Sequence, residues 1–99
     1  MVMNIQFVKM PVSEAMTEYV SGKLQKLTEK YEWIIKADVF FKLENDPAGN
    51  GKVCEIELSA PGPQLFAACN ENTFEYAAKK AVRELERQLK KRKAVLKPY

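Results

Sequence analysis

The chain has 99 residues, enough for one hydrophobic core but not for two, and its 46% hydrophobic and 29% charged residues exclude an intrinsically disordered protein. Its net charge of +3 is unevenly distributed, because residues 79–99 hold nine basic and two acidic residues, a net +7, while the other 78 residues carry a net −4. This asymmetry indicates an anionic partner that meets the C-terminal part of a single domain, residues 1–99.

The first predicted elements are a strand and a helix. Residues 2–8 are apolar and β-branched enough for a strand, and Pro11 ends it because proline has no backbone N–H to donate. Ser13 is a suitable N-cap, and a helix over about residues 13–31 follows from apolar side chains at spacings of three and four. This stripe consists of Met16, Val20, Leu24, Leu27 and Tyr31. Gly22 lies inside the helix and should cost about 1 kcal/mol relative to alanine.

Three strands are predicted in the middle of the chain. Residues 37–44 alternate between apolar and polar side chains, and residues 52–60 do so again. The run 45–51 between them is rich in turn-forming residues, which predicts a hairpin. A second turn at residues 61–63 precedes a short fourth strand over residues 65–69.

A second helix is predicted at the C-terminal end. Asn72 followed by Glu75 is typical of a capping box, and the helix should continue to about Leu96, near Pro98. Its apolar stripe consists of Phe74, Ala78, Ala81, Leu85 and Leu89. The expected fold is therefore α+β with the order β-α-β-β-β-α. One four-stranded, mainly antiparallel sheet with both helices on one face buries both stripes most simply.

The second helix carries basic residues along its outer side. On a helical wheel centred on Leu85, Glu84 and Glu86 fall at the two margins of this band. The band consists of Lys79, Lys80, Arg83, Arg87, Lys90, Lys91 and Lys97. A band without acidic residues in its middle suits a phosphate backbone.

The first helix has a basic flank of its own. This flank consists of Tyr19, Lys23, Lys26 and Lys30, and the acidic residues lie elsewhere around the helix. We hypothesise that the two helices pack side by side and join both basic surfaces into one patch. Two other interpretations stay open: a charged face that only keeps the protein soluble, and a basic helix that lies on a membrane surface.

Signals for catalysis, metal binding and export are weak. The chain has no histidine, so the commonest general base and the usual Cys/His zinc sites are missing, and Glu55 and Glu57 fit a solvent-facing strand. A small acid–base enzyme would need a concave pocket with a perturbed carboxylate or lysine. We expect Cys54 and Cys69 to be buried, reduced thiols on neighbouring strands. With no membrane-length apolar run and no signal pattern, the expected location is the cytoplasm.

Four segments resemble one known family, the ribosome hibernation promoting factors and ribosome-associated translation inhibitors of bacteria. They are Asn4-Ile5-Gln6, Tyr19-Val20 with residues 23–27, Leu65-Phe66-Ala67, and residues 87–93. The last segment is the most specific, because its basic run in the final helix accompanies a Lys-Leu-x-Lys-Leu pattern upstream. The resemblance extends over nearly the whole chain.

This resemblance implies a double-stranded-RNA-binding-domain-like fold and a non-enzymatic protein without a cofactor. Family members occupy the decoding channel of the small (30S) ribosomal subunit and exclude messenger and transfer RNA. The implied partners are that subunit and its rRNA, and a second ribosome-modulating factor is a possible further partner. A membrane and a small-molecule substrate are not expected. By resemblance, the residues that contact rRNA are Lys23, Lys26, Lys30, Lys79, Arg83, Arg87, Lys90, Lys91 and Lys93.

The chain is similar to the short form of the family, without the further C-terminal domain of the long form. This likeness implies a cytoplasmic, ribosome-associated protein of stationary phase and stress. It leaves open whether the protein pairs whole ribosomes or silences single ones. The alternative interpretation is a general double-stranded-RNA-binding protein, which would bind free duplexes with little dependence on ribosome structure.

Overall fold

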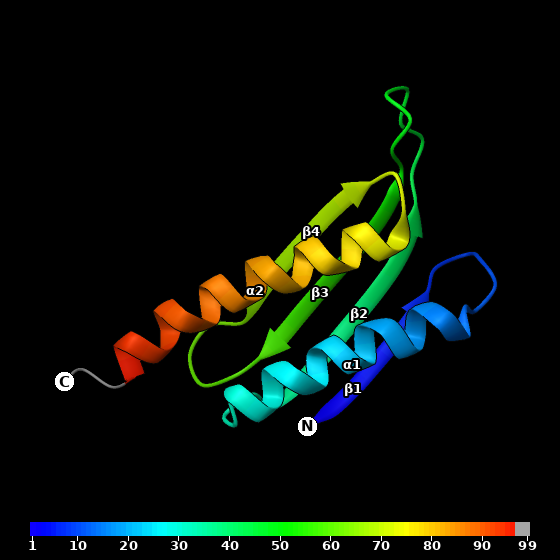
Figure 1. Ribbon diagram of the computed structural model, residues 1–99. Coiled ribbons are helices and arrows are strands. Elements are labelled where there is room, and N and C mark those ends of the chain that lie inside the picture. The colour runs from blue at the N-terminus through cyan, green and yellow to red at the C-terminus, as the bar shows by residue number, and fades with distance from the viewer. Residues whose placement is uncertain (97–99) are drawn as a thin grey trace.

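Two helices lie side by side on one face of a four-stranded sheet (Figure 1). The computed structural model describes residues 1–96. Its elements are β1 (Val2–Phe7), α1 (Glu14–Lys30), β2 (Lys36–Leu43), β3 (Lys52–Ser59), β4 (Leu65–Glu71) and α2 (Phe74–Leu96). The predicted order is confirmed, and the element ends differ by one or two residues. Lys97 and Pro98, which we assigned to the basic band and to the end of the second helix, lie outside the described residues.

The sheet is mixed, with the strand order β1-β2-β3-β4. β1 pairs with β2 in parallel, because α1 carries the chain back across the sheet between them, and the other two pairings are antiparallel. The β2–β3 hairpin projects beyond the helices (Figure 1). Gly51 ends the hairpin loop with φ 118°, and a Cβ atom there would collide with the backbone oxygen of Glu44. Only glycine fits this position without strain.

The core fills the space between the helices and the sheet. Alternate strand residues such as Phe41, Ile56 and Leu58 point into it and are fully buried. The predicted helical stripes supply the other side, through Val20, Leu24, Leu27, Ala78, Ala81, Leu85 and Leu89. Because alanine side chains are short, α2 lies close to β3 and β4. The outer sides of both helices therefore remain free for polar residues.

The helix starts show one correct and one wrong prediction. Ser13 caps α1, since its Oγ accepts from the backbone N–H of Met16 at 3.2 Å. For α2 the predicted Asn72 cap is wrong, because the Oγ1 of Thr73 accepts from the N–H of Tyr76 at 3.1 Å. Strand β4 runs to Glu71 and not to residue 69 as predicted, so the cap falls one residue later.

The two cysteines face each other across β3 and β4, and both are free thiols. Cys54 is fully buried, and burial raises its pKa to about 12. Cys69 was also expected to be buried but is only partly so. It lies on the edge strand and lines a hollow between β4 and α2.

Candidate nucleic-acid interface

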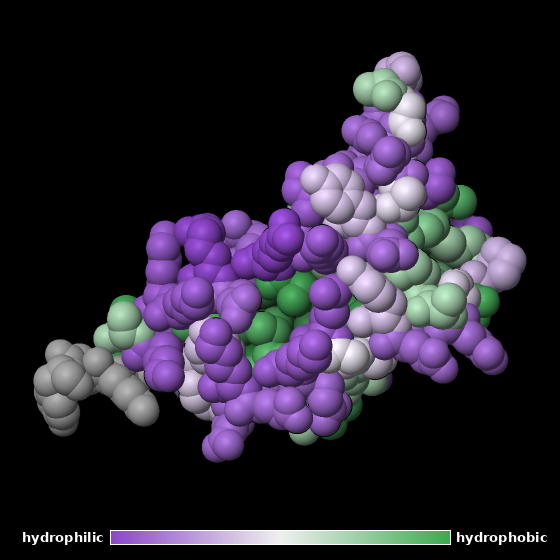
Figure 2. Space-filling model, in the orientation of Figure 1, coloured by the Kyte–Doolittle hydropathy of each residue, from purple (hydrophilic) through white to green (hydrophobic). Residues whose placement is uncertain are grey.

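A groove of about 320 Å³ runs between α1 and α2 and is lined mainly by cations. The structure therefore confirms the hypothesis that the basic surfaces of the two helices lie next to each other. Figure 2 shows hydrophobic atoms at the bottom of this groove, between hydrophilic rims on the two helices. The lining residues are Lys23, Lys26, Leu27 and Lys30 of α1 and Lys79, Val82, Arg83 and Glu86 of α2. Five of the nine predicted contact residues thus converge here.

The helical spacing explains this convergence. On α1, Lys23, Lys26 and Lys30 recur at three and four residues, which keeps them on the flank beside α2. On α2, Lys79 and Arg83 are four residues apart on the flank beside α1. Both flanks border buried stripes, so packing the stripes on the sheet brings the cations to the same opening.

Aromatic rings border two of the lysines. The Nζ of Lys23 lies 5.1 Å from the centre of the Tyr19 ring, and that of Lys30 lies 5.6 Å from the Tyr31 ring. A cation over a ring face is attracted by the negative potential of the ring. Both ammonium groups therefore lie within range of a favourable cation–π contact at the border of the groove.

Glu86 is an acidic residue in the groove that our wheel placed only at the margin of the α2 band. Its Oε2 accepts from the Nζ of Lys30 at 3.0 Å, which joins the two helices. This hydrogen bond and the charge of Glu86 raise the pKa of Lys30. The expected band without acid in its middle concerned α2 alone, and Glu86 lies at its margin as the wheel predicted; in the joined patch this margin falls between the cations of the two helices.

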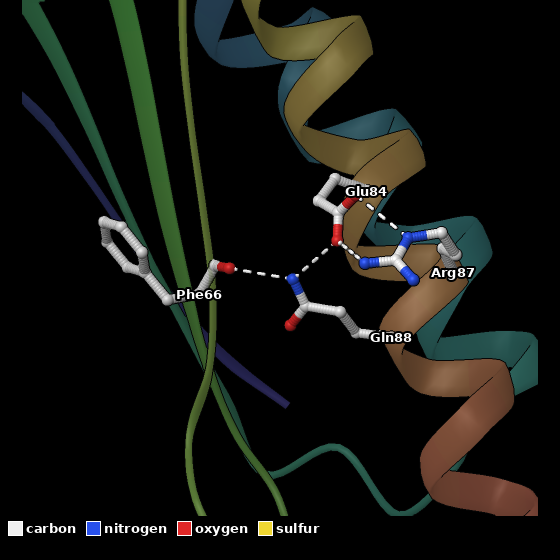
Figure 3. Close-up of polar contacts among 4 residues, drawn as sticks. All are labelled: Phe66, Glu84, Arg87 and Gln88. Carbon is white, nitrogen blue, oxygen red and sulfur yellow. Dashed lines mark hydrogen bonds and ion pairs between the residues drawn. The ribbon is translucent and has the colours of Figure 1, made fainter.

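The opposite flank of α2 holds two of the remaining predicted residues. Arg87 and Lys91 line a hollow beside the β4 edge, away from α1. Arg87 donates from Nε and Nη2 to Glu84 at 3.0 and 2.6 Å, and Gln88 links Glu84 to the Phe66 carbonyl of β4 (Figure 3). The hydrogen bonds from Arg87 and Gln88 lower the pKa of Glu84 to about 2. The guanidinium of Arg87 is thus already paired with a carboxylate of the same chain.

Lys90 and Lys93 are exposed on the last turns of α2. They follow Glu86 by four and seven residues, so they continue its flank of the helix toward the C-terminus. The nine predicted residues therefore form two groups. Seven lie at the groove or on its continuation along α2, and the other two, Arg87 and Lys91, lie at the β4 edge.

Comparison with known proteins identifies the family of this chain. Residues 3–97 match the model of the family described as Sigma 54 modulation protein / S30EA ribosomal protein. The chain belongs to this family. Membership in the S30EA family confirms the predicted resemblance to ribosome hibernation factors and the prediction that the chain is not an enzyme.

Two solved structures have the same fold as this S30EA family member. A ribosomal subunit interface protein from Coxiella burnetii matches 95% of this chain and 99% of its own, with a TM-score of 0.83 at 20% identity. The Protein Y N-terminal domain from Thermus thermophilus matches 90% of this chain and 93% of its own, with a TM-score of 0.73 at 26% identity. No curated protein matches the chain. These likenesses confirm the predicted α+β architecture.

Lys30 in the groove of this S30EA family member does not have the electrostatics of a catalytic base. A lysine that acts as a base needs a lowered pKa, whereas that of Lys30 is raised by Glu86. Within residues 1–96 no group of three His, Cys, Asp or Glu residues could hold a metal ion. In the same part of the chain, neither helix is both long and apolar enough to cross a membrane.

Sequence reasoning missed three side chains that shape the interface of this S30EA family member. Glu86 and Gln88 act through partners on α1 and β4, which the sequence alone does not identify. Arg92 donates from Nη1 to the Pro61 carbonyl at 2.7 Å and so fastens α2 to the turn before β4. A signal for Arg92 was available, because the wheel puts it near the buried side, unlike the other basic residues.

Proposed function

We propose that this protein inhibits translation by binding rRNA of the small ribosomal subunit in the decoding channel, where its bulk excludes messenger and transfer RNA. One domain, residues 1–99, would act in the cytoplasm without a cofactor or a turnover step. The observation that carries the proposal is the convergence of five cations from two helices on one groove. Membership in the S30EA family supports a ribosomal RNA partner over other polyanions.

The charge distribution supports RNA over a membrane surface. Ala78, Ala81 and Leu85 of the α2 stripe are fully buried against the sheet, so they cannot insert between lipids. What remains exposed is a cationic surface in which Lys23 and Lys30 lie beside aromatic rings. The phosphate groups of a nucleic-acid backbone are the ligands that such a cationic surface binds through Lys and Arg side chains.

Co-sedimentation separates ribosome binding from general duplex binding. The protein is mixed with purified small subunits or with an RNA duplex of equal concentration, and the bound fraction is measured in sucrose gradients. We expect tight binding to small subunits and weak binding to the duplex, and we expect added messenger RNA to compete. Equal binding to both RNAs would favour the general duplex-binding function, and no binding to subunits would overturn the proposal.

A further inference from the structure

The groove between α1 and α2 has an apolar floor that phosphate binding does not require. Leu27 and Val82 line it although they are only 5% and 9% exposed, and hydrophobic atoms are visible there in Figure 2. Phosphate oxygens are bound by charge and by N–H donors, whereas the flat face of a nucleobase packs on apolar side chains. Leu27 and Val82 belong to the core, and at the floor of the groove they offer an apolar contact for a base beside the backbone.

The carboxylate of Glu86 lies in this groove and repels phosphate. Lys30 donates to its Oε2, and within residues 1–96 no hydrogen bond is formed to its Oε1. A carboxylate accepts hydrogen bonds only, and each of its oxygens has two acceptor positions. Glu86 therefore offers acceptors for a ligand with N–H donors, beside cations for the phosphates of that ligand.

We propose that the groove binds one unpaired guanine nucleotide of the RNA, an inference that rests on the proposed function and specifies what its groove recognises. The guanine face packs on Leu27 and Val82, and its N1–H and N2–H groups donate to the two oxygens of Glu86. The phosphates on either side bind the rim lysines, which are Lys23, Lys26 and Lys79. Glu86 is then the residue that determines base specificity.

Guanine is the base whose edge matches a carboxylate. Its N1–H and N2–H donors are adjacent and parallel, like the two oxygens that receive them. Adenine and cytosine present an amino group next to an acceptor nitrogen, which a carboxylate repels. Uracil flanks its single N–H with two carbonyl oxygens. An unpaired base is required, because pairing in a helix occupies this edge.

A purely structural role for Glu86 makes a different prediction. If Glu86 only fixes α1 against α2 through Lys30, its replacement changes the binding of all nucleotides equally. If Glu86 recognises guanine, its replacement weakens the binding of guanine nucleotides alone. The replacement also removes a negative charge, so simple electrostatics predicts tighter binding of every nucleotide.

Nucleotide titrations followed by methyl NMR at Leu27 and Val82 test the proposal. The probes are guanosine, adenosine and uridine monophosphates and inorganic phosphate, at equal ionic strength. We expect the guanosine nucleotide to shift both methyl signals at a concentration about tenfold below the other two, and phosphate to leave them unchanged. Equal shifts by all three nucleotides, or shifts by phosphate alone, would overturn the proposal.

Two variants with the same charge change provide the decisive comparison. Glu86→Gln should weaken the binding of guanosine monophosphate by about tenfold and abolish the preference for guanine, since the buried edge of the base loses its charged hydrogen-bond acceptors. Glu29→Gln, on the exposed outer side of α1, should keep the preference. Circular dichroism melts establish that both variants fold. A guanine preference that survives Glu86→Gln would overturn the role of Glu86 and with it the proposal.

These titrations need no ribosome, so they are independent of the proposed function. A guanine preference in a protein that fails to co-sediment with small subunits would overturn the proposed function and leave the guanine site standing. Co-sedimentation without a guanine preference would overturn the guanine site and leave the proposed function standing.

Discussion

At the scale of single residues, Glu84 fixes the positions of Arg87 and Gln88 at the β4 edge. Hydrogen bonds from both lower its pKa from 4.5 to about 2. Because the folded-state pKa is depressed, the ionised carboxylate stabilises the fold above about pH 4.5, and this contribution is lost as the pH falls through about 2. Below that pH the carboxyl is protonated in the folded and the unfolded chain alike.

Glu84→Gln should therefore lower the melting temperature at pH 7 but not at pH 2. Glutamine removes the charge that Arg87 and Gln88 bind, so the difference from wild type should shrink between about pH 4.5 and 2. Circular dichroism melts across this range measure it. Glu18→Gln, at an exposed position on α1, is the control. A difference that stays constant with pH would contradict the assigned role of the Glu84 charge.

Lys26 tests whether the groove side of α1 contacts RNA. It lines the groove, whereas Glu29 on the same helix does not. Lys26→Glu should weaken binding to small subunits by about tenfold, because a phosphate contact is replaced by repulsion. Glu29→Lys should leave affinity unchanged or slightly tighter. Equal and opposite changes in co-sedimentation would mean that only net charge matters, and that α1 makes no specific contact.

At the scale of elements, the start of α2 depends on Thr73 and not on Asn72. Thr73→Ala should lower the free energy of unfolding by about 1 kcal/mol, because the N–H of Tyr76 loses its side-chain acceptor. Asn72→Ala should change it by less than about 0.5 kcal/mol, since Asn72 is exposed. Urea denaturation measures both. The opposite ranking would restore Asn72 as the cap.

Gly22 is an exposed glycine in the interior of α1, and a Cβ atom there would meet no atom within 4 Å. Gly22→Ala should therefore raise the free energy of unfolding by about 0.5–1 kcal/mol, through the smaller conformational freedom of the unfolded chain. The same urea denaturation detects the change. A destabilised variant would indicate that this position bends or moves in the folded protein.

Most of the elements could be predicted because their periods of two and 3.6 residues are local properties of the chain. The α2 cap could not, since Asn72 and Thr73 are both good cap residues and the end of β4 decides between them. Glu86 could not be placed in the groove, because its position depends on which flank of α2 faces α1. For the same reason the predicted set did not separate Arg87 and Lys91 from the groove residues.

At the scale of the whole molecule, folding brings together charges that the sequence keeps apart. The lysines at positions 23–30 meet Lys79 and Arg83 at one groove, because α1 and α2 lie side by side on the same face of the sheet. The opposite face of the sheet carries both basic and acidic residues, which form ion pairs such as Lys42 with Glu55 at 2.9 Å. One face is thus suited to a polyanion, and RNA should approach from the helical side.

The affinity for purified small subunits across a monovalent salt series at fixed magnesium tests RNA binding by this face most directly. Each neutralised phosphate releases counterions, so five to nine cationic contacts predict a log–log slope of roughly −4 to −8. Lys26→Glu should make this slope shallower by about one. A steep slope that Lys26→Glu reduces is the predicted result, and a flat plot would contradict binding through the groove between α1 and α2.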